Sequence, residues 1–145
     1  MFKKLRKNEK GFTLAELLIV VAIIGVLVAI SIPIFTSQLE KAREGVDEAN
    51  LRALYAETAS ALLTQDTTAN ANDIKGATLT VAKGENDVYT ATAVLTLSQQ
   101  KEGLEAGVTS VNIAGVDVAS SLFGPGKKIQ IVLKSDGTTP SITAG

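Results

Sequence analysis

The feature that most constrains this chain is an uncharged apolar run near its N-terminus, Leu17–Phe35. The run holds nineteen residues, none of them Asp, Glu, Lys or Arg. A helix needs roughly twenty apolar residues to cross about 30 Å of hydrocarbon, so the length predicts one membrane-spanning helix. Five basic side chains precede it, and they predict that the leader stays in the cytoplasm while residues after about 36 lie outside. These basic residues are Lys3, Lys4, Arg6, Lys7 and Lys10.

Two other kinds of segment have a similar composition. A cleaved secretory signal has an apolar region of about 7–15 residues followed by a small-residue cleavage site. The run here is longer, and Ser31–Phe35 at its end is a poor site of that kind. A plain membrane anchor would explain the length and the flanking charges. It would not explain the residues that lead into the run, Gly11–Leu17.

These residues read Gly-Phe-Thr-Leu-Ala-Glu-Leu and follow a basic leader that ends at Lys10. The stretch resembles the N-terminus of type IV prepilins and of the related pseudopilins of secretion and competence systems. In that family a peptidase cuts after the Gly, the new N-terminal residue is methylated, and a Glu lies four residues after it. The resemblance covers residues 1–40. It implies cleavage between Gly11 and Phe12, N-methylation of Phe12 and an assembly role for Glu16.

Glu16 lies at the edge of the apolar run, where an interfacial carboxylate facing lipid headgroups is the simpler interpretation. A charge inside a membrane helix costs on the order of 2.5–3.5 kcal/mol and is expected to be paired. Cleavage would give Phe12 an α-ammonium, which is unfavourable at a helix N-terminus, and methylation would leave its charge in place. The resemblance implies that Glu16 attracts this ammonium on a neighbouring subunit.

Gly25 and Pro33 interrupt the apolar run where many members of the family have residues that loosen the helix. Pro lacks a backbone N–H and clashes with the preceding turn, so Pro33 predicts a kink or an opening. Gly25 weakens a helix by roughly 1 kcal/mol relative to Ala, and it also permits close helix packing in a membrane. We expect the precursor to be mostly helical here, with unwinding only on assembly.

The helix is expected to continue to about residue 64 as an amphipathic segment. Two sets of residues follow helical spacing and predict an apolar stripe that receives a C-terminal sheet. The charged residues between them are interpreted as a solvated face. One set is Leu39, Ala42, Val46, Ala49 and Ala53; the other is Leu51, Leu54, Tyr55, Thr58 and Leu62; the charged residues are Glu40, Lys41, Glu44, Asp47, Glu48 and Arg52.

Beyond a polar loop at 64–73, short β-like runs alternate with turns. Strands are expected within 78–82, 88–97, 108–113 and 128–134, with an Asp-Gly turn at 135–138 before a last short run at 141–143. A short helix is the alternative expectation for 98–106. The predicted fold class is α+β, a long N-terminal helix packed against a small antiparallel sheet. The predicted divisions are a cleaved leader at 1–11, a transmembrane or filament-core helix at 12–35, an amphipathic half at 36–64 and a β-rich region at 65–145.

The composition excludes several kinds of chemistry. The chain has no Cys and no His, so thiol catalysis, disulfides, the common zinc sites and Ser-His-Asp catalysis are excluded. No catalytic constellation, calcium ladder or phosphate loop is visible, and no enzymatic activity, cofactor or metal is expected. Residues 12–145 carry nine basic and fourteen acidic side chains, a balance that predicts no direct nucleic-acid site. Many pilins close a C-terminal loop with a Cys pair, which this chain lacks; cysteine-free members are familiar from Gram-positive bacteria.

The resemblance therefore implies a structural subunit, the major pilin of a type IV pilus used for adhesion, motility or DNA uptake. It implies a single-pass inner-membrane precursor, a homo-oligomeric extracellular filament, and as partners a prepilin peptidase, a platform protein, an assembly ATPase and minor pilins. The alternative from the same family is a pseudopilin of a type II secretion or competence system. The remote alternative is a plain signal-anchored membrane protein.

Overall fold

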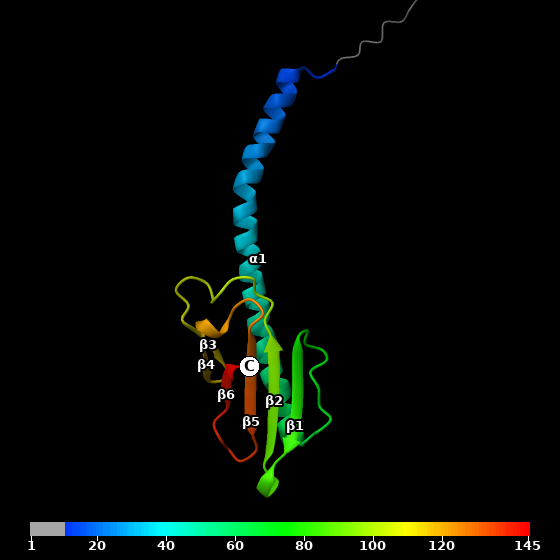
Figure 1. Ribbon diagram of the computed structural model, residues 1–145, viewed down its shortest axis with the longest axis vertical. Coiled ribbons are helices and arrows are strands. Elements are labelled where there is room, and N and C mark those ends of the chain that lie inside the picture. Colours follow the sequence, from blue (N-terminus) through cyan, green and yellow to red (C-terminus); the bar gives the residue numbers. More distant parts are fainter. Residues whose placement is uncertain (1–10) are drawn as a thin grey trace, which may run out of the picture. The chain divides into compact units, whose positions relative to one another are not determined.

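The computed structural model describes residues 11–145, so residues 1–10 of the predicted leader at 1–11 lie outside the described residues. The chain divides into two units that meet between Gln38 and Leu39, and each is described here by itself. One helix, α1 (Leu14–Thr64), contributes residues to both units. The remaining elements are six strands and two short 3-10 turns, all in the second unit (Figure 1).

In the first unit, α1 is exposed over its whole length up to Gln38. The exposed fraction of its large apolar residues runs from 47% at Val28 to 79% at Leu14. This part of α1 is long and apolar enough to cross a membrane. Isolated helices of this composition gain most of their stability from burying such a surface, so the unit is built to be covered by lipid or by other helices.

The second unit contains a four-stranded antiparallel sheet in the order β1-β2-β5-β6. The strands are β1 (Ala77–Lys83), β2 (Tyr89–Thr96), β5 (Lys128–Lys134) and β6 (Ser141–Ala144). Partners in register across all four strands are Leu79, Ala93, Ile131 and Ile142, and all four side chains are buried. Alternate residues of a strand point to opposite faces, so this row defines the core face of the sheet.

That face packs on the part of α1 that belongs to the second unit. Leu51, Leu54, Thr58 and Ala61 are buried on the helix, and its apolar members join the strand residues in one hydrophobic cluster. In Figure 1 this part of α1 lies behind β1, β2 and β5. The predicted α+β class, with one long helix against a small antiparallel sheet, is confirmed.

Only one of the two predicted apolar sets receives the sheet. In the set that begins at Leu39, every member is exposed, with Leu39 at 40% and Val46 at 53%. The buried set is the one that contains Leu51 and Leu54. A single sheet can cover only one side of a helix, so a helix with apolar stripes on opposite sides leaves one of them uncovered.

Two expectations for the region after β2 are wrong. Residues 98–106 form turns and bends rather than a short helix, and a strand that the sequence did not predict, β4 (Val116–Ala119), pairs with β3 (Ser110–Ile113). The two-residue link Ala114-Gly115 has positive φ at both positions, the geometry of the tightest hairpins. Ala at the first of these positions does not resemble the usual Asn-Gly or Asp-Gly turn, which is why the hairpin was not predicted.

Candidate functional site

The segment from Gly11 to Glu16 begins the described part of the first unit, and all its residues are exposed. Gly11 and Phe12 precede the helix, and the Phe12 side chain is 89% exposed. A peptide bond in exposed chain outside a helix or strand is accessible to an enzyme. The geometry around Gly11 and Phe12 therefore agrees with the predicted cleavage, without testing it.

Glu16 closes a reciprocal hydrogen-bonded cap with Thr13. The Thr13 backbone N–H and hydroxyl each donate to Glu16 Oε2 at 2.8 Å. In return the Glu16 backbone N–H donates to Thr13 Oγ1 at 3.2 Å. Thr13 is the N-cap residue and Glu16 the third residue of α1, so this is a capping box. The pattern Thr-x-x-Glu was readable in the sequence and was missed there.

The cap leaves Glu16 able to bind a second partner. Within residues 11–145 all its hydrogen bonds as acceptor use Oε2, and a carboxylate has acceptor capacity on both oxygens. The cap also fixes the side chain over the first turn of the helix. Thr13 thereby holds the Glu16 carboxylate close to the new N-terminus that cleavage would create.

Gly25 and Pro33 both lie inside α1, which continues through them without interruption. A Cβ added at Gly25 would meet no atom within 4 Å, so nothing in the single chain requires glycine there. Near Pro33, the Ser31 hydroxyl donates to the Leu27 carbonyl at 2.6 Å and the Thr36 hydroxyl donates to the Pro33 carbonyl at 3.0 Å. These hydroxyls add bonds to the part of the helix where Pro33 itself cannot donate one.

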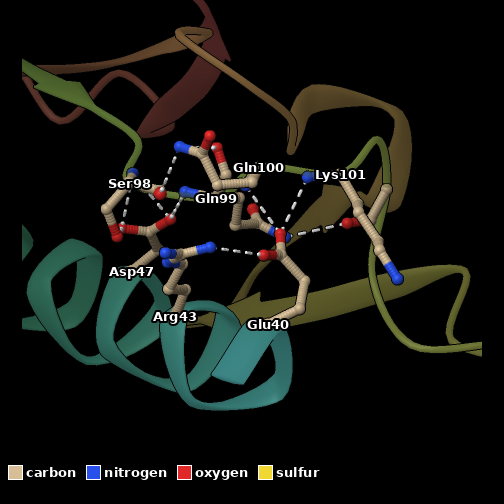
Figure 2. A network of polar contacts seen from close by, with 8 residues as sticks. Glu40, Arg43, Asp47, Ser98, Gln99, Gln100 and Lys101 are labelled. Carbon is tan, nitrogen blue, oxygen red and sulfur yellow. Dashed lines mark hydrogen bonds and ion pairs between the residues drawn. The ribbon is translucent and has the colours of Figure 1, made fainter. Parts of the chain in front are cut away.

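Two acidic residues of α1 in the second unit were interpreted from the sequence as solvated, and this interpretation is wrong. Glu40 and Asp47 are 4% and 1% exposed. Each accepts backbone N–H groups from the loop after β2 (Figure 2). Their spacing of seven residues places both on one helix face, the face that continues into Leu51 and Leu54. That continuity is the signal that could have identified them.

Among the described residues no group of acidic side chains is suited to hold a metal ion. An open hollow of about 480 Å³ at the end of α1 is lined by three acids, Glu57, Asp66 and Asp73. Asp66 there already accepts the Thr68 backbone N–H and hydroxyl, bonds that lower the pKa of its carboxyl. The hollow is therefore a polar surface feature in which Asp66 is already hydrogen-bonded within its own loop.

The comparisons with known proteins show that this chain is similar to type IV pilins. The family described as the prokaryotic N-terminal methylation motif matches residues 6–32. The chain is similar to the type IV major pilin PilA of Myxococcus xanthus, with 50% identity over 48 residues, 33% of this chain and 22% of that protein. It is also similar to the type IV major pilin PilE of Neisseria gonorrhoeae, with 39% identity over 95 residues, 58% of this chain and 56% of that protein.

A third relative is the type IV narrow pilus major component PilA5 of Thermus thermophilus, with 50% identity over 52 residues, 34% of this chain and 45% of that protein. The resemblance to the type IV pilin family is therefore confirmed. The matched stretches span between about a fifth and just over half the length of these relatives. No solved structure matches the chain significantly.

Proposed function

We propose that this chain is the major structural subunit of a type IV pilus. In this proposal it is made as a membrane-anchored precursor, cut between Gly11 and Phe12, methylated on Phe12 and polymerised into an extracellular filament. The observation that carries the proposal is the first unit. The N-terminal methylation motif, matched at residues 6–32, includes the start of its helix, and this helix exposes apolar side chains on every side. Such a surface is stable only in lipid or among other helices.

The second unit supports polymerisation through its uncovered helix face. Exposed residues recur there with alternating spacings of three and four, the heptad pattern that packs one helix along another. Half of them are alanines, whose small side chains permit close approach of two backbones. The residues of this outer stripe are Leu39, Ala42, Val46, Ala49, Ala53, Ala56, Ser60 and Leu63. A lipid anchor alone would not need an apolar stripe on this unit.

Glu16 is proposed to recruit the subunit into the filament. A neighbour's Phe12 ammonium would bind the side of the carboxylate that Thr13 leaves open. In a water-poor environment that ion pair is strong, and an unpaired charge there is costly. Gly25 and Pro33 are proposed to let the intervening helix lengthen as it leaves the membrane, because both residues weaken helical hydrogen bonding.

In this proposal the four predicted segments have different roles. They are a cleaved leader at 1–11, a filament-core helix at 12–35, an amphipathic half of the helix at 36–64 and a surface region at 65–145. A prepilin peptidase, a platform protein and an assembly ATPase would act on the precursor, and minor pilins would join the filament. A structural subunit of this kind performs no catalysis of its own. Adhesion, surface motility and DNA uptake are the proposed uses.

The deciding experiment is mass spectrometry of the mature N-terminus in cells that carry the processing machinery. We expect a chain that begins at Phe12 and bears one added methyl group. The matched control is Gly11→Leu, which removes the small residue before the cut and leaves the helix unchanged; it should keep the leader. A wild-type chain that retains Met1 would refute the processing step and favour a plain signal anchor.

Electron microscopy then separates the pilus from a secretion apparatus. Long filaments that a specific antibody decorates along their length support a major pilin. Absence of such filaments, together with a secretion or competence defect in the deletion strain, would instead assign the chain to the pseudopilins.

A further inference from the structure

The loop that follows β2 is held on α1 mainly by carboxylates. The Ser98 backbone N–H donates to Asp47 Oδ2 at 2.9 Å and Oδ1 at 3.0 Å, and the Gln99 N–H donates to Oδ2 at 3.1 Å. Two helical turns before Asp47, Glu40 Oε1 accepts the Gln100 N–H at 2.7 Å and the Lys101 N–H at 2.8 Å. Four successive backbone donors of the loop therefore end on two buried carboxylates (Figure 2).

We propose that this contact is an acid-sensitive clasp: the loop at 98–109 stays docked on α1 while Glu40 and Asp47 are ionised, and it detaches when they are protonated, with the sheet intact. The proposal concerns the second unit alone and does not depend on the pilus assignment. In this proposal the ionisation of Glu40 and Asp47 controls whether the loop at 98–109 is docked on the helix.

Other tethers of the loop are few. Within the described residues the Gly103 N–H donates to the Phe123 carbonyl at 2.9 Å, and the Glu105 N–H donates to a third helix carboxylate, Glu44, at 3.0 Å. Glu102 pairs with Lys127, and the Thr109 carbonyl accepts the Ser120 N–H at 2.8 Å. The loop pairs with no strand between Leu97 and Ser110. Removing the bonds to Glu40 and Asp47 would thus leave residues 98–101 without a hydrogen bond to the helix.

Protonation changes what the carboxylates can do. An ionised carboxylate only accepts, whereas a protonated one places an O–H donor where an N–H donor already points. Asp47 has little room for this change, because it also accepts the Ser98 hydroxyl at 2.7 Å and is surrounded by donors. A buried N–H without an acceptor favours an open loop, where water can satisfy it.

Several charged groups lie around the clasp and influence whether the loop is docked or released. Arg43 Nη1 lies 3.2 Å from Glu40 Oε2, and Lys41 pairs with Glu105 across the helix and loop. Lys75, from the segment before β1, lines the same hollow as Asp47. Neighbouring charged side chains on the same helix and loop are Glu44, Glu48 and Lys101, and Glu102 of the loop pairs with Lys127 from the segment before β5. Arg43 favours the ionised form of Glu40, which places release on the acidic side of neutrality.

The docked loop also contains a buried side chain, Gln99, whose hydrogen bonding is incomplete. Gln99 is fully buried, and its amide donates to the Gly103 carbonyl at 2.9 Å. Its Oε1 has no hydrogen-bond partner among the described residues. An unpaired buried acceptor opposes docking, so the carboxylates hold a segment that would gain hydration on release. Release would uncover Gln99 together with the half-buried Leu104.

The test is amide hydrogen exchange of the full-length chain in detergent micelles, from about pH 7 to about pH 3, corrected for the intrinsic pH dependence of exchange. We expect protection at 98–101 to fall by roughly tenfold or more before any loss at Ala91–Leu95 in β2, because local opening precedes global unfolding. The double variant Glu40→Gln, Asp47→Asn should show the open loop already at pH 7 and little further change in acid. Glu48→Gln, a matched loss of charge on the same helix, should behave as wild type.

Two results would overturn the proposal. One is loop protection that persists in acid as long as β2 persists. The other is simultaneous loss of protection in the loop and in β2. If the double variant fails to fold, the wild-type titration alone still separates these outcomes from the expected one.

Discussion

The Glu16 carboxylate accepts two hydrogen bonds from Thr13, from its backbone N–H and its hydroxyl, both at 2.8 Å. The same acid that is proposed to meet a neighbour's N-terminus thus also begins its own helix. The two roles use different contacts of the Glu16 side chain, so substitutions at Thr13 and at Glu16 can separate them.

Thr13→Ala should weaken the start of the helix by about 1 kcal/mol, the usual cost of losing an N-cap. Thr13→Ser should restore it, because the hydroxyl is retained. Amide exchange of the first turn in micelles measures the effect. Glu16→Ala should remove the cap and also reduce filament yield far more than Thr13→Ala does. Equal filament yields from the two alanine variants would assign Glu16 to the cap alone.

Pro33→Ala restores a backbone N–H to the helix and should slow exchange between Gly25 and Pro33 in assembled filaments. In micelles the same change should matter little, because α1 is already continuous through Pro33. Exchange that is equally slow at 25–33 and in the flanking turns of wild-type filaments would contradict the proposed unwinding. Gly25→Ala, which meets no atom in the single chain, provides the companion variant.

Leu54→Ala should lower the free energy of unfolding of the second unit by about 2–5 kcal/mol, the range for emptying a fully buried leucine site. Leu63→Ala, at an 85% exposed position of the same helix, should change it by less than about 0.5 kcal/mol. Denaturant titration in micelles, followed through the sheet's far-UV signal, measures both. Similar losses at the two positions would contradict the assignment of the buried face.

Ala53→Arg should leave the second unit folded and reduce filament formation, because a large charged side chain would stand on the outer stripe. Ala82→Arg places the same change on an exposed position of β1 and serves as the control for charge and bulk. Filament yield by sedimentation and folding by proteolysis report the two effects. Assembly of Ala53→Arg at the control level would exclude the stripe as a helix contact.

The lowered pKa of the Glu40 carboxyl predicts how the stability of the second unit changes with pH. Burial raises its pKa. The N–H bonds from Gln100 and Lys101 and the ion pair with Arg43 together lower the pKa by more than burial raises it, so it lies below the ordinary value of 4.5. A group whose pKa is depressed on folding stabilises the folded state above its ordinary pKa, and this contribution is lost as the pH falls through the folded value. The free energy of unfolding should therefore fall from about pH 6 to about pH 3 by more in wild type than in Glu40→Gln. A slope unchanged by the substitution would contradict this account. Asp66 and Asp136 also have lowered pKa values, held by Thr68 and Thr138, and are common to both proteins.

The sequence predicted the long helix well because its signals are local and strong: an unbroken apolar run from Leu17 to Phe35 and helical spacing beyond it. The class of the C-terminal region and most of its strands were also predictable. The order of the strands was not, because pairing between distant segments is decided by the whole core. β4 was missed because Ala114-Gly115 carries a weak turn signal.

The site was predicted unevenly for a similar reason. Residues 11–16 belong to a contiguous motif, which a sequence displays directly. Which side of α1 the sheet covers is a tertiary choice, and both stripes satisfied the same spacing rule. Glu40 and Asp47 appeared solvated because acids are rarely buried, unless donors from elsewhere in the chain compensate them. Those donors are backbone groups of the loop after β2, which no side-chain pattern reveals.

The last strand, β6, is held in the second unit by backbone pairing and not by a disulfide. β6 pairs with β5 from Val132↔Ser141 to Ile129↔Ala144, and the Gly145 N–H donates to the Lys128 carbonyl at 2.9 Å. With no cysteine in the chain, backbone pairing secures the terminal segment that many pilins fasten with a disulfide. Folding of this unit therefore requires no oxidant and no thiol-exchange catalyst, and reductants in the surroundings cannot loosen it.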